Sequence, residues 1–317
     1  MELQSNELQQ LYKPVPGASP VTPVHWHVLG AGAMGCLFAS KLQRAGCPTT
    51  LLLRQAPATA FTTVRIEAQD SCTRVQLQQS AVADTGAIAL LLVTTKAQDV
   101  CAAVASVAHR LDAASQLLLL SNGLGYGDAL RATLPQLKIF SGTTTQGAYR
   151  LGDQHICHAG AGLTRIGRRE SATPPRWFEQ WSAAVQPSSW DNNIEQALWL
   201  KLAINCAINP LTALHGCRNG ELARPPLADQ VQGLCTEIMA VSAAAGFAAI
   251  TSDLPQQVGK LIHSTADTRP SMLQDVSARR ATEIEYITGH LLRVARQHKI
   301  AAVQNAALYR SVVNLGH

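Results

Sequence analysis

The segment that decides the fold is His25–Gly46, with the sequence HWHVLGAGAMGCLFASKLQRAG. Its first residues, His25–Leu29, predict a strand, and the run Ala33–Arg44 predicts a helix that ends at Gly46. A GxGxxG motif lies between them. Because the motif stands where a strand turns into a helix, it predicts the first unit of a dinucleotide-binding α/β fold.

Each glycine of this motif has its own physical role. Gly30 permits the tight turn, Gly32 lets the backbone approach a diphosphate, and Gly35 allows the helix to pack closely on the strand. The N–H groups and dipole at the helix N-terminus then bind the anion. The predicted cofactor contacts of the loop are Gly30, Ala31, Gly32, Ala33, Met34 and Gly35. A glycine-rich turn that binds nothing is the alternative explanation.

The rest of the N-terminal half alternates short apolar runs with helical sequence. The predicted strands are Thr49–Leu53, Val64–Glu67, Ile88–Thr94 and Gln116–Leu120, with a helix at Ala97–Leu111. Further strand-like runs, expected to extend the sheet, lie at Lys138–Phe140, His155–Cys157 and Leu163–Ile166. Continuous apolar strands between helices are typical of a parallel sheet covered on both faces. We therefore predict an α/β fold with a Rossmann-type, doubly wound N-terminal domain.

The second half of the chain reads almost entirely as helix. The predicted helices are Ile194–Leu214, Leu227–Ala245, Leu254–His263, Met272–His298 and Ala302–Val313. We divide the chain into an irregular, proline-containing leader (1–24), a Rossmann-like domain (25–192) that carries the dinucleotide motif, and an all-α domain (193–317), which is left as the expected place for substrate and catalysis.

Composition narrows the class of protein. The chain has 317 residues, of which 47% are hydrophobic and 15% charged, with a formal net charge of +5. Scattered basic residues and few aromatic ones argue against nucleic-acid binding and fit an anionic small-molecule substrate. Lys201 interrupts the longest apolar run, and the leader lacks a signal segment, so we expect a soluble, cytoplasmic protein without membrane contact.

The eight cysteines include no CxxC pair, which excludes the usual zinc spacing, and no metal is expected. A monomer or homodimer is expected, and the sequence does not decide between them.

Three polar residues lie within two positions of the carboxyl ends of predicted strands, where ligands of doubly wound sheets bind. Arg54 stands where an NAD site would have a carboxylate, so it favours NADP through the 2′-phosphate, unless it is a solvated strand-end residue. Lys96 is expected near cofactor phosphates and Asn122 near the nicotinamide ribose. Turn chemistry explains both positions equally well.

The predicted helix Ile194–Leu214 carries a polar stripe on an apolar background. Lys201, Asn205 and Asn209 recur every four residues and therefore share one face. A snorkelling lysine and locally bonded amides would explain the stripe without a ligand. Because Pro210 disfavours α geometry at the residue before it, we expect the helix to kink or end near Asn209 and to free that side chain for binding.

Several motifs follow one another along about residues 25–312: LGAGAMG, LLVTTKAQ, SNGLG, SGTTTQGA, KLAINCAINPLTAL, RNGEL and SMLQDVSARRATEIEYITG. Together, and in this order, they resemble the ketopantoate reductase (2-dehydropantoate 2-reductase) family. The resemblance implies NADPH-dependent reduction of 2-dehydropantoate to (R)-pantoate, a step of pantothenate biosynthesis.

The resemblance also implies roles for individual residues. It makes Lys201 the proton donor, and it makes Asn205, Asn209 and Asn219 substrate ligands. It makes Ser271 the residue that binds the substrate carboxylate, and it makes Asn122 a contact of both substrate and cofactor. It places Glu283 beside the cofactor and the reacting centre, and Ala148 near the cofactor. Two positions depart from the family pattern: Gln146 stands where relatives often have histidine, and Thr268 precedes the SMLQD motif where they often have asparagine. A substrate contact at Thr268 is therefore in question, and the leader has no family counterpart.

The chemistry of hydride transfer to a 2-keto acid suits these residues. The developing alkoxide needs a proton, and apolar surroundings would lower the pKa of Lys201 enough to ease donation, whereas an ionised Glu283 would oppose that shift. The amides both donate and accept, as the substrate's 4-hydroxyl requires. Ser271 also begins a capping-box pattern with Gln274, and Asp275 and Glu285 are expected to be surface or salt-bridge residues.

Two other functions stay open. The first is reduction of another branched or hydroxylated 2-keto acid on the same fold. The second is a non-catalytic NADP-binding sensor, against which the full set of polar site residues argues.

Overall fold

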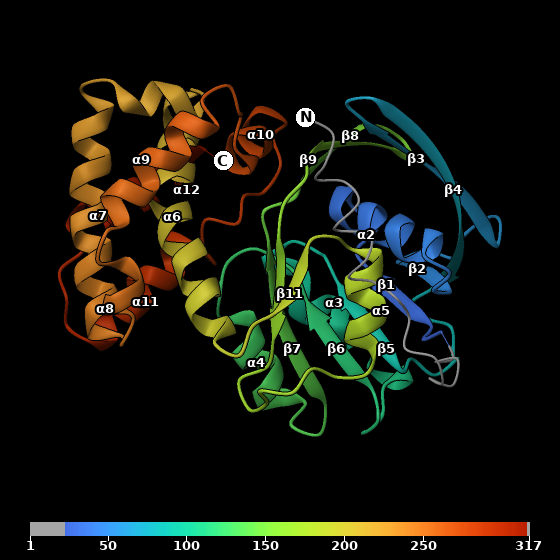
Figure 1. Cartoon of the computed structure of the whole chain (residues 1–317). Coiled ribbons are helices and arrows are strands. Elements are labelled where there is room, and N and C mark those ends of the chain that lie inside the picture. The colour runs from blue at the N-terminus through green and yellow to red at the C-terminus, as the bar shows by residue number, and fades with distance from the viewer. Residues whose placement is uncertain (1–22, 316–317) are drawn as a thin grey trace, which may run out of the picture.

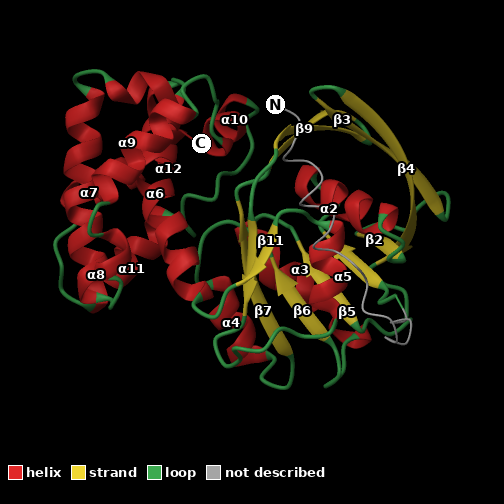
Figure 2. Cartoon of the chain, viewed as in Figure 1, coloured by secondary structure: helices red, strands yellow, loops and turns green. Residues whose placement is uncertain are grey.

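A computed structural model describes residues 23–315, so the predicted leader falls almost wholly outside the described residues. The N-terminal part is built on an 11-stranded sheet in the order β11-β10-β7-β6-β5-β1-β2-β4-β3-β9-β8. Helices make up the part that follows, and it lies beside the sheet (Figures 1 and 2).

The centre of the sheet is parallel and doubly wound, as predicted. Its strands, in spatial order, are β7 (Lys138–Thr144), β6 (Gln116–Leu119), β5 (Leu90–Val93), β1 (Trp26–Leu29), β2 (Thr49–Leu53) and β4 (Ser71–Ala81). Chain order reverses on either side of β1, which pairs in parallel with both β2 and β5. Ligands of such sheets bind at this switch point, outside the carboxyl ends of the strands.

Toward its edges the sheet contains antiparallel as well as parallel pairs, so the parallel arrangement predicted for the central strands does not extend over the whole sheet. The additional strands are β3 (Phe61–Ala68), β8 (Gly147–Gly152), β9 (His155–Gly160), β10 (Thr164–Gly167) and β11 (Ser188–Trp190). Antiparallel pairs join β3 to β4, β8 to β9 and β10 to β7. The strands β4, β8 and β11 were missed because none of them is a continuous buried apolar run.

Helices cover both faces of the sheet because successive strand residues point to opposite sides. Leu90 and Leu92 pack with α2 (Ala33–Arg44) and α5 (Trp177–Ala184) on one face. Leu91 and Val93 pack with α3 (Val100–Ser106) and α4 (Tyr126–Thr133) on the other.

The β3–β4 edge of the sheet, with β9 and β8 beyond it, curves over α2 (Figure 1). As a result α2 contacts β8 and β9 as well as the central strands. The glycine loop that begins α2 is thereby placed beside the β8–β9 hairpin.

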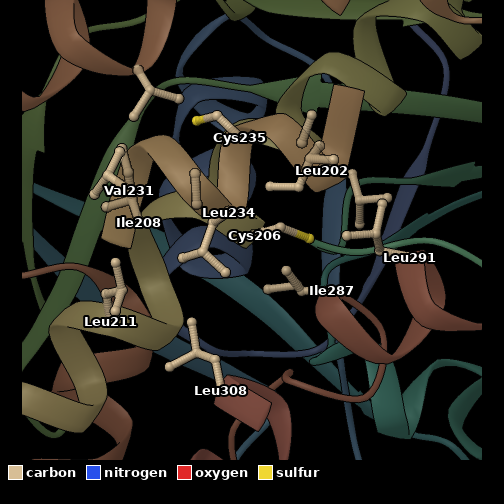
Figure 3. Packing of buried hydrophobic residues seen from close by; sticks show 14 of the residues in the cluster. Leu202, Cys206, Ile208, Leu211, Val231, Leu234, Cys235, Ile287, Leu291 and Leu308 are labelled. Carbon is tan, nitrogen blue, oxygen red and sulfur yellow. The ribbon is translucent and has the colours of Figure 1, made fainter. Parts of the chain in front are cut away.

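The helical part surrounds α6 (Ile194–His215), the longest described helix. The other helices are α7 (Leu227–Ala244), α8 (Ala248–Thr251), α9 (Leu254–Ser264), α10 (Ser271–Ser277), α11 (Thr288–Gln297) and α12 (Val303–Leu315). Side chains of α6, α7, α11 and α12 form its core, among them Cys206, Leu234, Leu291 and Leu308 (Figure 3). By length and hydropathy α6 would suit a membrane span, but 61% of its most apolar window is buried here, as expected of a core helix.

Three predicted helices differ from the structure. The predicted helix Ala97–Leu111 consists of two 3-10 turns on either side of α3. The predicted helix Met272–His298 is interrupted between α10 and α11, where Arg279 adopts a left-handed φ of 52°. Finally, α6 does not end at Asn209: it continues through Pro210 to the left-handed Gly216, so core packing overrides the loss of one backbone hydrogen bond.

Gly35→Ala should destabilise the protein, because a Cβ there would lie 2.0 Å from the carbonyl oxygen of Gly30. We expect a loss of about 2 kcal/mol or more in the free energy of unfolding, measured by urea denaturation. Gly32→Ala is the matched control, since no described atom lies within 4 Å of its added Cβ, and it should cost about 1 kcal/mol or less. Equal losses in the two variants would contradict the packing role of Gly35.

Candidate active site

The glycine loop has the geometry that a dinucleotide requires. Gly30 has a φ of 108°, and a Cβ on it would lie 2.6 Å from the backbone nitrogen of Thr95. Gly32, by contrast, faces open space among the described residues. No described side chain caps the N-terminus of α2, and its first turn contains no acidic residue. The loop therefore fits a diphosphate bound by backbone N–H groups.

The strand β8 lies over this loop. Ala148 packs with Ala31, Ala33 and Met34 against the same apolar cluster. Two residues further along β8, an Nη of Arg150 donates a hydrogen bond to the carbonyl oxygen of Ala31. Arg150 was not among the predicted site residues.

Arg54 directly follows β2, and its side chain is 83% exposed. Its guanidinium lies 3.7 Å from a carboxylate oxygen of Asp99, a long and exposed contact that contributes little to stability. The 2′-phosphate role of Arg54 stays a prediction.

The dipeptide Lys96-Ala97, which follows β5, contacts the helical part at several points. The ammonium of Lys96 forms an ion pair with Asp275 of α10 and donates to the carbonyl of Ala281 at 3.0 Å. The adjacent N–H of Ala97 donates to Oε1 of Glu283 at 2.9 Å. Lys96 therefore has a partner of its own, and its expected contact with cofactor phosphates stays a prediction.

Asp275 was expected at the surface, but its side chain is only 7% exposed. It pairs with both Lys96 and Arg280, so the alternative expectation of a salt bridge is confirmed. Glu285 is exposed and pairs with Arg293.

The loop after β6 docks on the segment that carries Glu283. Nδ2 of Asn122 donates to Oε2 of Glu283 at 3.1 Å, and the N–H of Leu124 donates to the carbonyl of Tyr286 at 2.9 Å. Between them Gly123 has a φ of 76°, and a Cβ on it would lie 2.5 Å from the same carbonyl oxygen. Glu283 is buried, and both of its carboxylate oxygens accept hydrogen bonds from the Rossmann-type part.

Lys201 lies half-buried on the face of α6 that points toward the sheet. Its ammonium donates to the carbonyl of Thr144 at the end of β7, with an Nζ–O distance of 2.8 Å. Burial lowers the pKa of Lys201 to about 8, while the charge of Glu283 acts in the opposite direction. At neutral pH the group is therefore a protonated acid that gives up its proton more readily than an exposed lysine does.

The predicted amides lie on α6 and on elements packed against it. Asn205 is half-buried and Asn209 buried on α6, one and two turns beyond Lys201. Asn219 begins a 3-10 turn (Asn219–Ala223) and donates through Nδ2 to Oγ1 of Thr265 at 2.7 Å. Its buried Oδ1 has no hydrogen-bond partner among the described residues, so it can still accept from a ligand.

Ser271 begins α10, which packs against α6. The capping box predicted for it is wrong: Pro270 occupies the cap position, and Gln274 instead donates to the carbonyl of Arg269. A serine that is the first helical residue cannot cap the helix as an N-cap does, so its exposed hydroxyl is not used there.

The two residues that depart from the family pattern, Gln146 and Thr268, both take part in hydrogen bonds near the site. Gln146 is buried, accepts a hydrogen bond from Nζ of Lys41 at 2.6 Å and bonds through its backbone N–H to Oγ1 of Thr144. Thr268 is exposed, and its carbonyl accepts the N–H of Asn219. Gln146 thus braces the residue whose carbonyl holds Lys201, and Thr268 supports Asn219 through its backbone.

Two kinds of contact in this site could not be predicted from the sequence. The carbonyl of Thr144 and the N–H of Ala97 are backbone groups, which carry no signature in residue type. Asp275 and Arg150 are charged side chains whose partners lie far away in the sequence.

A doubly wound sheet with an open glycine loop, facing a helical part that supplies a lysine and several amides, defines a two-domain dehydrogenase or reductase. Comparison with known proteins makes the class specific. The family description "Ketopantoate reductase PanE/ApbA" matches residues 26–171, and its C-terminal counterpart matches residues 193–315. The chain belongs to the ketopantoate reductase family and is an oxidoreductase.

Individual relatives agree with this assignment. A 2-dehydropantoate 2-reductase of Vibrio cholerae is 37% identical over 290 residues, which cover 91% of this chain and 96% of the relative. A PanE/ApbA family ketopantoate reductase from Ralstonia eutropha superposes with a TM-score of 0.83 at 24% identity, covering 92% of this chain and 98% of the other. D-mandelate dehydrogenase, solved with NADH and anilino(oxo)acetate, has a TM-score of 0.84 at 20% identity with the same coverage. These two structures show the shared fold.

Asp275→Ala should weaken the contact between the two parts, because it removes the buried carboxylate that pairs with the ammonium of Lys96 and leaves that charge without its partner. We expect a loss of about 2 to 3 kcal/mol in the free energy of unfolding, measured by urea denaturation. Arg280→Ala removes the more exposed partner of Asp275 and should cost about 1 kcal/mol or less. An unchanged stability of Asp275→Ala would show that the ion pair contributes nothing.

Proposed function

We propose that the chain catalyses the NADPH-dependent reduction of 2-dehydropantoate to (R)-pantoate. The observation that carries the proposal is the position of Lys201, a half-buried lysine with a pKa of about 8 near the buried carboxylate of Glu283. Such a group is a general acid suited to a reaction that generates an alkoxide.

The glycine loop is the proposed site of the cofactor diphosphate. Its open face at Gly32 and the uncapped N-terminus of α2 support this assignment. Arg54 is the proposed partner of the 2′-phosphate, and Lys96, Asn122, Ala148 and Glu283 are proposed as further contacts. When bound, the cofactor supplies the hydride.

The polar face of α6 is the proposed substrate site. Asn205, Asn209 and Asn219 would bind the 4-hydroxyl and neighbouring oxygens, and the free Oδ1 of Asn219 supports this role. Ser271 would bind the carboxylate. Because these amides need a hydroxyl partner, keto acids without one would leave them unpaired and react more slowly.

Lys201 would protonate the alkoxide as it forms. The carbonyl of Thr144 fixes the position of Nζ and accepts only one of its hydrogens, so the others are available to the substrate. Glu283 would orient Asn122 and keep Lys201 protonated through its negative charge.

Reduction of another 2-keto acid is the second candidate, because D-mandelate dehydrogenase shows that this fold is not restricted to one substrate. A non-catalytic NADP sensor is disfavoured by the low pKa and fixed position of Lys201. A cytoplasmic location, the monomeric or homodimeric state and the domain boundary at residue 192 stay predictions.

The purified protein should oxidise NADPH in the presence of ketopantoate, as followed by absorbance at the nicotinamide band. Replacing ketopantoate by 2-ketoisovalerate, which lacks the hydroxyl, should lower kcat/KM by about 100-fold or more. Equal rates with both substrates would favour the broader 2-keto acid activity. No turnover with either, despite NADPH binding, would favour the sensor.

Lys201→Ala should lower kcat by about 100-fold or more while leaving NADPH affinity within about threefold.

In the wild type kcat should fall as the pH rises through about 8, because the general acid must be protonated. Glu283→Gln removes the charge that raises this pKa, so its basic limb should move to lower pH. Pre-steady-state pH profiles of both enzymes would test this, and a limb that moves to higher pH would contradict the role of Glu283.

A further inference from the structure

We propose that Arg150 is a ligand of the cofactor diphosphate, brought to the glycine loop by the β8–β9 hairpin. The proposal rests on the proposed function, since it assumes a dinucleotide at this loop. It adds a charged side chain to a glycine loop whose own donors are backbone N–H groups.

The geometry follows from the sheet topology. The strand β9 pairs with β3 at the curved edge of the sheet, and β8 follows it across α2 (Figure 1). Ala148 and Arg150 are two residues apart on β8 and therefore point to the same side of the strand. Ala148 packs against the same apolar cluster as the loop residues, and Arg150 reaches the carbonyl of Ala31 within the loop itself.

The chemistry of the loop favours an anion beside this arginine. The helix N-terminus offers only a partial positive charge, while a diphosphate carries about two negative charges. The two cations of α2, Lys41 and Arg44, lie in its last turn, at the end away from the loop, and Lys41 donates to Gln146. One Nη of Arg150 donates to the carbonyl of Ala31. The guanidinium also lies 3.7 Å from a carboxylate oxygen of Asp153, which is almost fully exposed. Its other N–H groups remain able to donate to a ligand. Arginine is well suited to bind phosphate oxygens with such donors.

A purely structural alternative exists. Arg150 would then only hold β8 against the glycine loop, and its loss would weaken the binding of every ligand of the domain to the same degree. If Arg150 binds the diphosphate, its loss should weaken the binding of compounds that contain a diphosphate and leave the binding of other compounds unchanged.

The experiment measures dissociation constants by calorimetry for NADPH, NADH, ADP-ribose and adenosine 2′-monophosphate. Arg150→Met keeps the apolar stem and should weaken NADPH, NADH and ADP-ribose by about 10-fold or more, leaving adenosine 2′-monophosphate within about twofold. Arg54→Ala should show the complementary pattern, weakening only NADPH and adenosine 2′-monophosphate. Arg150→Lys should recover part of the loss.

Arg74→Met is the matched control, because Arg74 is an exposed arginine on β4 of the same sheet. It should leave all four constants unchanged. Unchanged binding in Arg150→Met, or equal weakening of all four ligands, would overturn the diphosphate role. Failure of the wild type to bind either dinucleotide would instead overturn the proposed function on which this inference rests.

Discussion

The buried carboxylate of Glu283 connects the two parts of the chain. One oxygen accepts the N–H of Ala97 after β5, and the other accepts the amide of Asn122 after β6. Both donors stand at carboxyl ends of neighbouring parallel strands, the edge at which doubly wound sheets bind ligands. Glu283 therefore fixes the helical part against this edge of the sheet, and its charge also acts on Lys201 within the helical part.

The local conformation around Glu283 explains why this is possible. The sequence from Met272 to His298 has helical composition throughout, yet α10 ends at Ser277 and α11 begins only at Thr288. A continuous helix would hold Glu283 on a regular helical face, whereas the irregular segment lets its carboxylate and the carbonyls of Ala281 and Tyr286 meet the sheet loops. Tertiary hydrogen bonds have overridden local helix propensity here.

This case also shows what the sequence can and cannot predict. The unit His25–Gly46 was predicted to within a residue, because a strand, a GxGxxG turn and a helix that stops at a glycine have independent local signatures. The strand β8 was missed because it is mostly exposed and its partner β9 is set by a hairpin at the sheet edge. Among candidate site residues, Lys201 and its asparagines were found by their helical spacing. Thr144 was not found as a partner of Lys201, because it acts through its carbonyl, and Asp275 was assigned no site role, because its partner Lys96 is distant in the sequence.

The placement of Lys96 and Ala97 side by side has a mechanical consequence. A single contact between two bodies acts as a pivot, about which they can still rotate. Here a side chain and the next backbone N–H are held by two separate groups, and Leu124 adds a third anchor at Tyr286. Anchors on two separate loops of the sheet resist twisting better than a single contact does, so the lysine on α6 keeps its orientation toward the edge of the sheet.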